Sequence, residues 1–172
     1  MEALYQRPGF IIRRAHQIVL ALFDEAASDL GITTTQYGIL HTLRARPGID
    51  QIGLCELIGI DRSTATMVLR LLEKNGLIER IQSQEDKRRN LLSLTDEGHR
   101  MLVRAAPLTQ AISGRMAEVL SEEDIAQVTA GLTKFVNAFN HRVRAPIIAD
   151  TTPPAGQSAD RPVFPAELSD DA

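Results

Sequence analysis

The chain of 172 residues is 44% apolar and 24% charged with a net charge of −3, and one domain is the default at this length. Its single cysteine, Cys55, excludes a disulfide framework and a cysteine-based structural zinc site. Because Arg13 and Arg14 interrupt the N-terminal apolar run and no small-residue cleavage site follows, we expect neither a membrane span nor secretion, but a soluble cytoplasmic protein.

The first predicted element is a helix of about five turns that ends before Gly31. Apolar residues recur there at steps of three and four, which places them on one side of a helix. They are Ile11, Ala15, Ile18, Leu22 and Ala26. The pattern therefore predicts a helix with one broad apolar face.

A second helix is predicted from Thr33 to about Ala45. Thr33 and Gln36 have the spacing of a capping box, in which each side chain bonds the backbone N–H of the other residue. Pro47 and Gly48 follow and end the helix.

Two shorter helices are predicted next, joined by a tight turn. Asp50 caps the first, and Gly59 ends it in a left-handed conformation. Asp61 caps the second, which ends before Gly76. The inward face of this second helix carries Ala65, Val68, Leu69 and Leu72.

The pattern then changes to short strands. Residues 77–81 and 91–94 are strand-like apolar runs that flank the charged stretch 83–90, so a β-hairpin with a polar tip is predicted. Residues 61–90 carry seven basic and five acidic side chains, although the whole chain is acidic. Positive charge is therefore concentrated on the last short helix and the hairpin.

Two long helices follow. Thr95 caps one that runs through about Leu120 and must absorb Pro107 as a kink or a break. Ser121 opens the other, whose apolar residues repeat at three and four through Phe139. The apolar stripes of the first and last helices fit either a helix-pairing seam or an ordinary core face, and the pattern leaves both open.

The final segment, residues 145–172, has a different composition. It holds five of the eight prolines and ends in an acidic stretch. Such a sequence buries too little apolar surface to offset the entropy of ordering, so we expect a mobile tail, or one that packs only against a partner.

Two short helices followed by a basic hairpin are typical of a winged helix-turn-helix. With its inward face apolar, the second helix turns four polar side chains and one methionine outward near its N-terminus: Arg62, Ser63, Thr66, Met67 and Arg70. Hydroxyl groups and arginines suit base edges and phosphates in a major groove. The alternative is an ordinary solvated face.

The hairpin tip carries three consecutive basic residues, Lys87, Arg88 and Arg89. Beside a recognition helix they are placed to reach a minor groove, where negative potential is focused. Phosphate would repel Asp86, so we expect this carboxylate to orient Arg88 by pairing with it. A solvated loop without a DNA contact is the alternative.

Residues 61–66 (DRSTAT) and 72–80 (LEKNGLIER) resemble the recognition helix and first wing strand of the multiple-antibiotic-resistance regulator (MarR) family. Residues 86–88 (DKR) and 94–98 (LTDEG) resemble its wing tip and wing exit. The resemblance implies an all-α fold with a small β-wing: a six-helix, winged helix-turn-helix homodimer on a pseudo-palindromic double-stranded DNA site. Members are usually repressors that a small ligand releases.

The resemblance also implies a division of the chain and particular DNA contacts. Its units are a dimerisation helix at 8–32, a winged module at 33–98, dimerisation helices at 99–144 and the tail at 145–172. Matched contacts are Ser63, Thr64 and Thr66 on the recognition helix and Arg88 on the wing. Met67 and Arg70 depart from the family's commoner residues, which implies a different base preference.

Residues 8–18 (PGFIIRRAHQI) resemble a subgroup that controls aromatic-acid and hydroxycinnamate breakdown, including regulators that answer to aryl-CoA thioesters. This implies a small aromatic or aryl-CoA effector between the dimerisation helices and the winged module. Candidate effector contacts are Arg13, Arg14, His16, Tyr37 and His41. Each also has an ordinary structural explanation, as a surface arginine, a capping histidine or a core tyrosine.

Other function classes find less support in the residues. An enzyme would require Ser63 or Cys55 to work with His41 or His99, but no phosphate loop or metal-ligand spacing accompanies them, so we expect no catalytic residues, metal or cofactor. Redox sensing through Cys55 is a second alternative, although its apolar neighbours favour a core role. A helical protein-interaction module is a third, and it leaves the basic hairpin unexplained.

Overall fold

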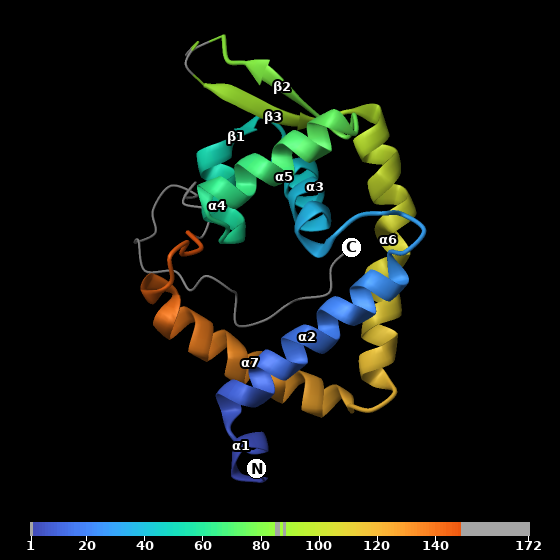
Figure 1. Cartoon of the computed structure of the whole chain (residues 1–172), viewed down its shortest axis with the longest axis vertical. Coiled ribbons are helices and arrows are strands. Elements are labelled where there is room, and N and C mark those ends of the chain that lie inside the picture. Colours follow the sequence, from blue (N-terminus) through green and yellow to red (C-terminus); the bar gives the residue numbers. More distant parts are fainter. Residues whose placement is uncertain (1, 85–86, 88, 149–172) are drawn as a thin grey trace.

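The computed structural model describes residues 2–84, 87 and 89–148. They form a mainly helical chain with one small antiparallel sheet (Figure 1). The elements are α1 (Glu2–Tyr5), α2 (Pro8–Ala26), α3 (Thr34–Ala45), β1 (Ile49–Asp50), α4 (Gln51–Ile58), α5 (Arg62–Lys74), β2 (Ile78–Gln82), β3 (Asn90–Leu94), α6 (Asp96–Ala117), α7 (Glu122–Phe139) and the 3₁₀ helix η1 (Asn140–Arg142).

The structure confirms the predicted helix starts at Thr33, Asp50, Asp61, Thr95 and Ser121. In each, a side chain bonds a backbone N–H of the first helical turn. Thr33 and Gln36 form both hydrogen bonds of a capping box. Asp50 accepts from the Gly53 N–H at 2.9 Å, and Thr95 accepts from the Gly98 N–H at 3.1 Å. Each bond satisfies a backbone donor that the first helical turn leaves free.

Two features differ from the sequence-based expectation. The short α1 precedes α2, so the described residues contain seven α-helices instead of six, while α2 begins at the expected Pro8, where proline's missing N–H costs nothing. Residues 49–50 form a third strand, so the sheet order is β1-β3-β2. Of the kink or break expected at Pro107, the structure excludes the break, because α6 continues through this residue.

The winged helix-turn-helix lies at one end of the molecule (Figure 1). Helices α3, α4 and α5 pack there beside the sheet, α2 and α7 lie at the other end, and α6 runs between the two ends. The core at the winged end is fully buried and draws on four elements: Leu40, Leu54, Leu69 and Leu92. This core fixes α5 with its opposite face turned outward.

The helices at the other end leave much apolar surface uncovered within one chain. No residue of α7 is buried, and its exposed apolar side chains follow one face: Val128, Leu132, Phe135 and Phe139. Helix α2 also exposes Ile11, Ile12, Ile18 and Val19. Among the described residues, no helix combines the length and the apolar composition needed to cross a bilayer.

Residues 143–148, here called the strap, return from α7 to the helix-turn-helix. The Asn140 side chain donates to the Ile147 carbonyl at 2.6 Å and accepts its N–H at 2.9 Å, while the Ile148 N–H donates to the Glu56 carbonyl at 2.7 Å. Ile147 and Ile148, which lie in the segment predicted to be a mobile tail or to pack only against a partner, therefore have hydrogen-bond partners on η1 and α4. Residues 149–172 lie outside the described part of the chain.

A glycine pair tests whether the strap packs on the helix-turn-helix. Gly59 and Gly31 both have positive φ, 66° and 62°. A Cβ at Gly59 would lie 2.7 Å from Ile147 Cγ1, whereas one at Gly31 meets nothing within 4 Å. We expect Gly31→Ala to lower the free energy of unfolding by about 1–2 kcal/mol, through left-handed strain alone. Gly59→Ala should cost at least about 1 kcal/mol more in urea denaturation; equal losses would show that the strap does not cover the turn.

Candidate nucleic-acid interface

The N-terminus of α5 is held by Asp61. Its carboxylate accepts hydrogen bonds from the Ser63 hydroxyl, from the Thr64 hydroxyl at 2.7 Å and from the N–H groups of both residues at 3.1 Å. These bonds, led by that of the Ser63 hydroxyl, hold the pKa of the Asp61 carboxyl well below its ordinary value. The hydroxyl protons of Ser63 and Thr64 are therefore committed to the cap, not free for a nucleic acid.

The structure also separates Thr64 from the outward face of α5. Thr64 lines a largely apolar cavity of about 510 Å³. Phe135 and Phe139 of α7 and residues of the strap line the same cavity. The Thr64 side chain, which the resemblance assigns to DNA, thus faces this cavity in the protein. Nothing in this geometry directs the Thr64 side chain toward a groove.

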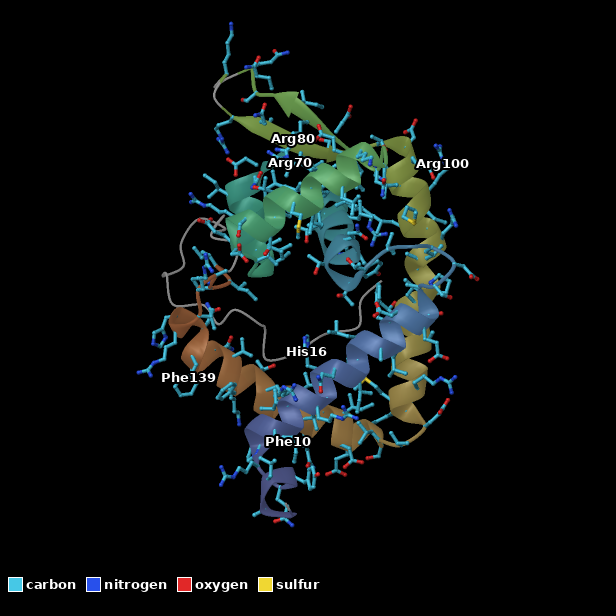
Figure 2. The ribbon with its side chains drawn as sticks, viewed as in Figure 1. Phe10, His16, Arg70, Arg80, Arg100 and Phe139 are labelled. Carbon is cyan, nitrogen blue, oxygen red and sulfur yellow. The ribbon has the colours of Figure 1, made fainter. Side chains whose placement is uncertain are left out.

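The outward face itself is confirmed as a polar surface beside the hairpin. Met67 is 67% exposed, and Arg62 and Arg70 are exposed with it. Figure 2 places Arg70 and Arg80 on the hairpin side of α5, at the end of the molecule far from α2 and α7. Arg80 bonds Glu73 at 3.2 Å and so ties β2 to α5.

Arg89 has a partner that the sequence pattern did not indicate. Its guanidinium donates to Asp50 Oδ2 from Nε at 2.9 Å and from Nη2 at 2.6 Å. The Gly53 N–H and, after it, Arg89 lower the pKa of the Asp50 carboxyl. Arg89, a predicted DNA contact, thus ties the end of the wing turn to the cap of α4.

The remaining wing residues are only partly described. Lys87 is exposed, and its carbonyl accepts from the Gln82 side-chain amide at 2.7 Å. Asp86 and Arg88, with their predicted pairing, lie outside the described residues. Lys87 thus lies on an exposed turn between β2 and β3, as the sequence predicted.

The three candidate effector residues on α2 point in different directions around the helix. His16 and Phe23 are seven positions apart, so they share a face to within about 20°, and Figure 2 shows His16 on the side turned toward the winged module. Arg14 is nine positions from Phe23, about 180° around the helix, and Arg13 lies between these extremes. Arg14 therefore points away from the winged module.

An aromatic cluster joins α2 and α3, made of Phe23 on α2 and of Tyr37 and His41 on α3. The Tyr37 ring centroid lies 5.8 Å from that of Phe23 and 6.0 Å from that of His41. Burial and then the nearby Arg44 lower the pKa of His41, so its neutral ring accepts from the Arg44 guanidinium at 3.1 Å. Arg44, which the sequence did not single out, contacts this cluster through its bond to His41.

The alternative sites gain no support from the geometry. Cys55 is only 6% exposed, and burial raises the pKa of its thiol, the opposite of what a reactive thiol needs. The Ser63 hydroxyl donates to Asp61 instead of a histidine. The described residues contain no group of three metal-ligating side chains.

Comparisons with known proteins agree with the winged fold. Residues 32–89 match the MarR family. The transcriptional regulator HosA of Escherichia coli O111:H- is 30% identical over 136 residues, which cover 79% of this chain and 99% of HosA. A putative transcriptional regulatory protein for the hcr operon of Thauera aromatica is 35% identical over 56% of this chain and 58% of its own length.

Solved structures match over the same extent. PcaV from Streptomyces coelicolor, in complex with its natural ligand, has a TM-score of 0.72 and 32% identity and covers 78% of this chain and 95% of PcaV. The repressor CouR, bound to a 23-mer DNA duplex, has a TM-score of 0.73 and 29% identity over 77% of this chain and 94% of its own. This chain has the capped α5 and the hairpin wing, and it matches HosA over 99% and PcaV over 95% of their lengths. It therefore belongs to the MarR family of winged-helix transcriptional regulators.

Proposed function

We propose that this protein is a homodimeric repressor that binds a pseudo-palindromic DNA operator and leaves it when a small aromatic ligand binds. The observation that carries the DNA contact is the outer face of α5. Arg62, Met67 and Arg70 are exposed there, while Leu69 and Leu72 hold the inner face in the core. A rigid helix with a free polar face matches what a major groove accepts.

The contacts divide into readout and positioning. Met67, Arg70 and Thr66 lie on the outer face and are the proposed readers of base edges. Arg62, Lys87 and Arg88 are proposed to meet phosphates or the minor groove. Ser63, Thr64 and Arg89 are given positioning roles instead, because their donors bond Asp61 and Asp50.

Arg70→Ala tests the proposed reader. The full-length chain first selects its preferred duplex from a randomised library, and footprinting should show half-sites about one helical turn apart. We expect Arg70→Ala to weaken binding to this duplex by about 1–3 kcal/mol per half-site, with little change on random DNA. Arg100→Ala, the same charge change on α6, is the control. Equal losses for both variants would remove α5 from the readout.

An aromatic acid or aryl-CoA thioester is the proposed effector class. Residues 8–18 carry this proposal through their resemblance to regulators of aromatic-acid breakdown. Two observations support it: Tyr37 of α3 packs against Phe23 of α2 and against His41, and His16 lies on the side of α2 turned toward the winged module. A ligand there can release DNA only if it prefers a domain spacing that no longer fits two half-sites.

Arg13→Ala and Arg14→Ala form a test and its matched control for the proposed effector site. A panel of aromatic acids and their CoA thioesters is screened by thermal shift, since a ligand of the folded state raises Tm. We expect Arg13→Ala to weaken the affinity for an anionic hit about tenfold, the loss of one charge-assisted hydrogen bond. Arg14→Ala, on the face of α2 turned away from the winged module, should leave this affinity unchanged. Calorimetry that finds both variants at wild-type affinity would place the anion elsewhere.

A further inference from the structure

Thr66 lies in the middle of the outer face of α5, yet its hydroxyl is already occupied. Oγ1 donates to the Arg62 carbonyl at 2.7 Å and accepts from Nε2 of Gln51 at 2.8 Å. The same Gln51 amide also lies 3.4 Å from the Arg62 carbonyl. Gln51, the first residue of α4, therefore joins the two helices of the helix-turn-helix at this position.

A hydroxyl has one proton and two lone pairs. Because the Thr66 proton points to a carbonyl of its own helix, it is not available to an acceptor on a base or a phosphate. One lone pair is taken by Gln51. The remaining branch of the side chain is the Cγ2 methyl group, on a residue that is partly exposed between Arg62 and Arg70.

We infer that Thr66 reads a thymine through a methyl–methyl contact, with Gln51 as the positioning residue that holds its hydroxyl away from the DNA. The C5-methyl of thymine is the one apolar group that a base presents in the major groove, and a threonine methyl is one of its usual partners. This inference rests on the proposed binding of α5 in the major groove. It adds the chemical basis of one base preference and a role for Gln51.

Two conservative variants separate the methyl from the hydroxyl. Thr66→Ser keeps both hydrogen bonds and removes the methyl. Thr66→Val keeps a methyl in the same place, since valine on a helix strongly favours one χ1, and removes both hydrogen bonds. If the hydroxyl were the reader, serine would preserve the preference and valine would abolish it.

The experiment uses the full chain and the duplex it selects from a randomised library, with each thymine replaced in turn by deoxyuridine, which lacks only the 5-methyl group. For the wild type we expect one thymine per half-site at which this replacement weakens binding about fourfold, the effect of one buried methyl. Thr66→Val should show the same ratio. Thr66→Ser should bind thymine and uracil duplexes equally.

Gln51→Leu completes the test as a positioning variant. It should reduce the thymine-to-uracil ratio in the wild-type background but leave the ratio of Thr66→Val unchanged, because valine has no hydroxyl to hold. A ratio kept by serine and lost by valine, or kept by all variants, would overturn the inference while α5 remains a reader. If the wild type selects no duplex over random DNA, the proposed function itself fails, and the inference with it.

Discussion

Gly98→Ala should lower the free energy of unfolding by about 3 kcal/mol, a loss measured as a lower urea midpoint with an unchanged m-value. Gly98 lies in the first turn of α6, where a Cβ would be 2.1 Å from the Leu77 carbonyl oxygen and 3.2 Å from Leu94 Cδ2. The Leu77 carbonyl also accepts the Thr95 N–H at 3.2 Å. Because the obstacle is backbone in hydrogen-bonded structure, no side-chain rotation can relieve the collision.

Gly114→Ala is the matched control, since Gly114 lies in the same helix and a Cβ there meets nothing within 4 Å. Alanine favours a helix over glycine by about 1 kcal/mol, so this variant should be as stable as the wild type or more so. Two variants with the same small change in stability would contradict the close approach of α6 to the start of β2.

Local interactions explain why so much of the fold could be predicted from the sequence. The caps at Thr33, Asp61 and Ser121 each join a side chain to a backbone N–H two or three residues on, so the motif contains both partners. The three- and four-residue spacing of apolar side chains also identified the inner face of α5, because this spacing lies within one segment. Interactions between residues a few positions apart can be predicted from the sequence of that segment alone.

Contacts between distant segments could not be predicted in this way. Asp50 and Arg89 are 39 positions apart, and nothing in either segment indicates that the wing returns to the cap of α4. The strap is similar, because Ile147 gains partners only where the fold brings η1 and the helix-turn-helix together. Both contacts bear on a prediction: Arg89 has an ion-pair partner within the chain, and Ile147 and Ile148 have hydrogen-bond partners on η1 and α4.

The candidate site shows the same division. Helical periodicity correctly placed Met67 and Arg70 on the outer face, since the face of a residue depends on spacing alone. It could not show that the Thr64 hydroxyl serves Asp61, or that the Thr66 proton serves the Arg62 carbonyl. A polar residue on the correct face can still have its donors committed elsewhere, and only the three-dimensional contacts reveal it.

Leu132→Asp should convert the protein to a monomer and weaken binding to its selected duplex by at least about a hundredfold. Leu132 lies on the exposed apolar face of α7, four positions from Val128 and three from Phe135. We propose that a second copy covers this face together with the exposed residues of α2. Two-fold symmetry would then place the substitution in the interface twice, each time burying an unpaired carboxylate at a cost of several kcal/mol.

The loss of DNA affinity is expected because the dimer holds two recognition helices together. In a dimer, the second half-site is bound at a high effective concentration, which raises the overall affinity by about 10²–10⁴ over one module. A monomer loses this gain while each winged module keeps its own contacts. Binding to a single half-site should therefore be unchanged by Leu132→Asp, and only the two-site duplex should show the loss.

Val103→Asp is the matched control, because Val103 is 74% exposed on α6 and the same acidic change there lies outside the proposed seam. Light scattering at micromolar concentration should find this variant dimeric and Leu132→Asp monomeric. A Leu132→Asp protein that remains dimeric would show that the α7 face is not the seam. One that becomes monomeric yet binds the two-site duplex as tightly as the wild type would show that dimerisation contributes nothing to operator affinity.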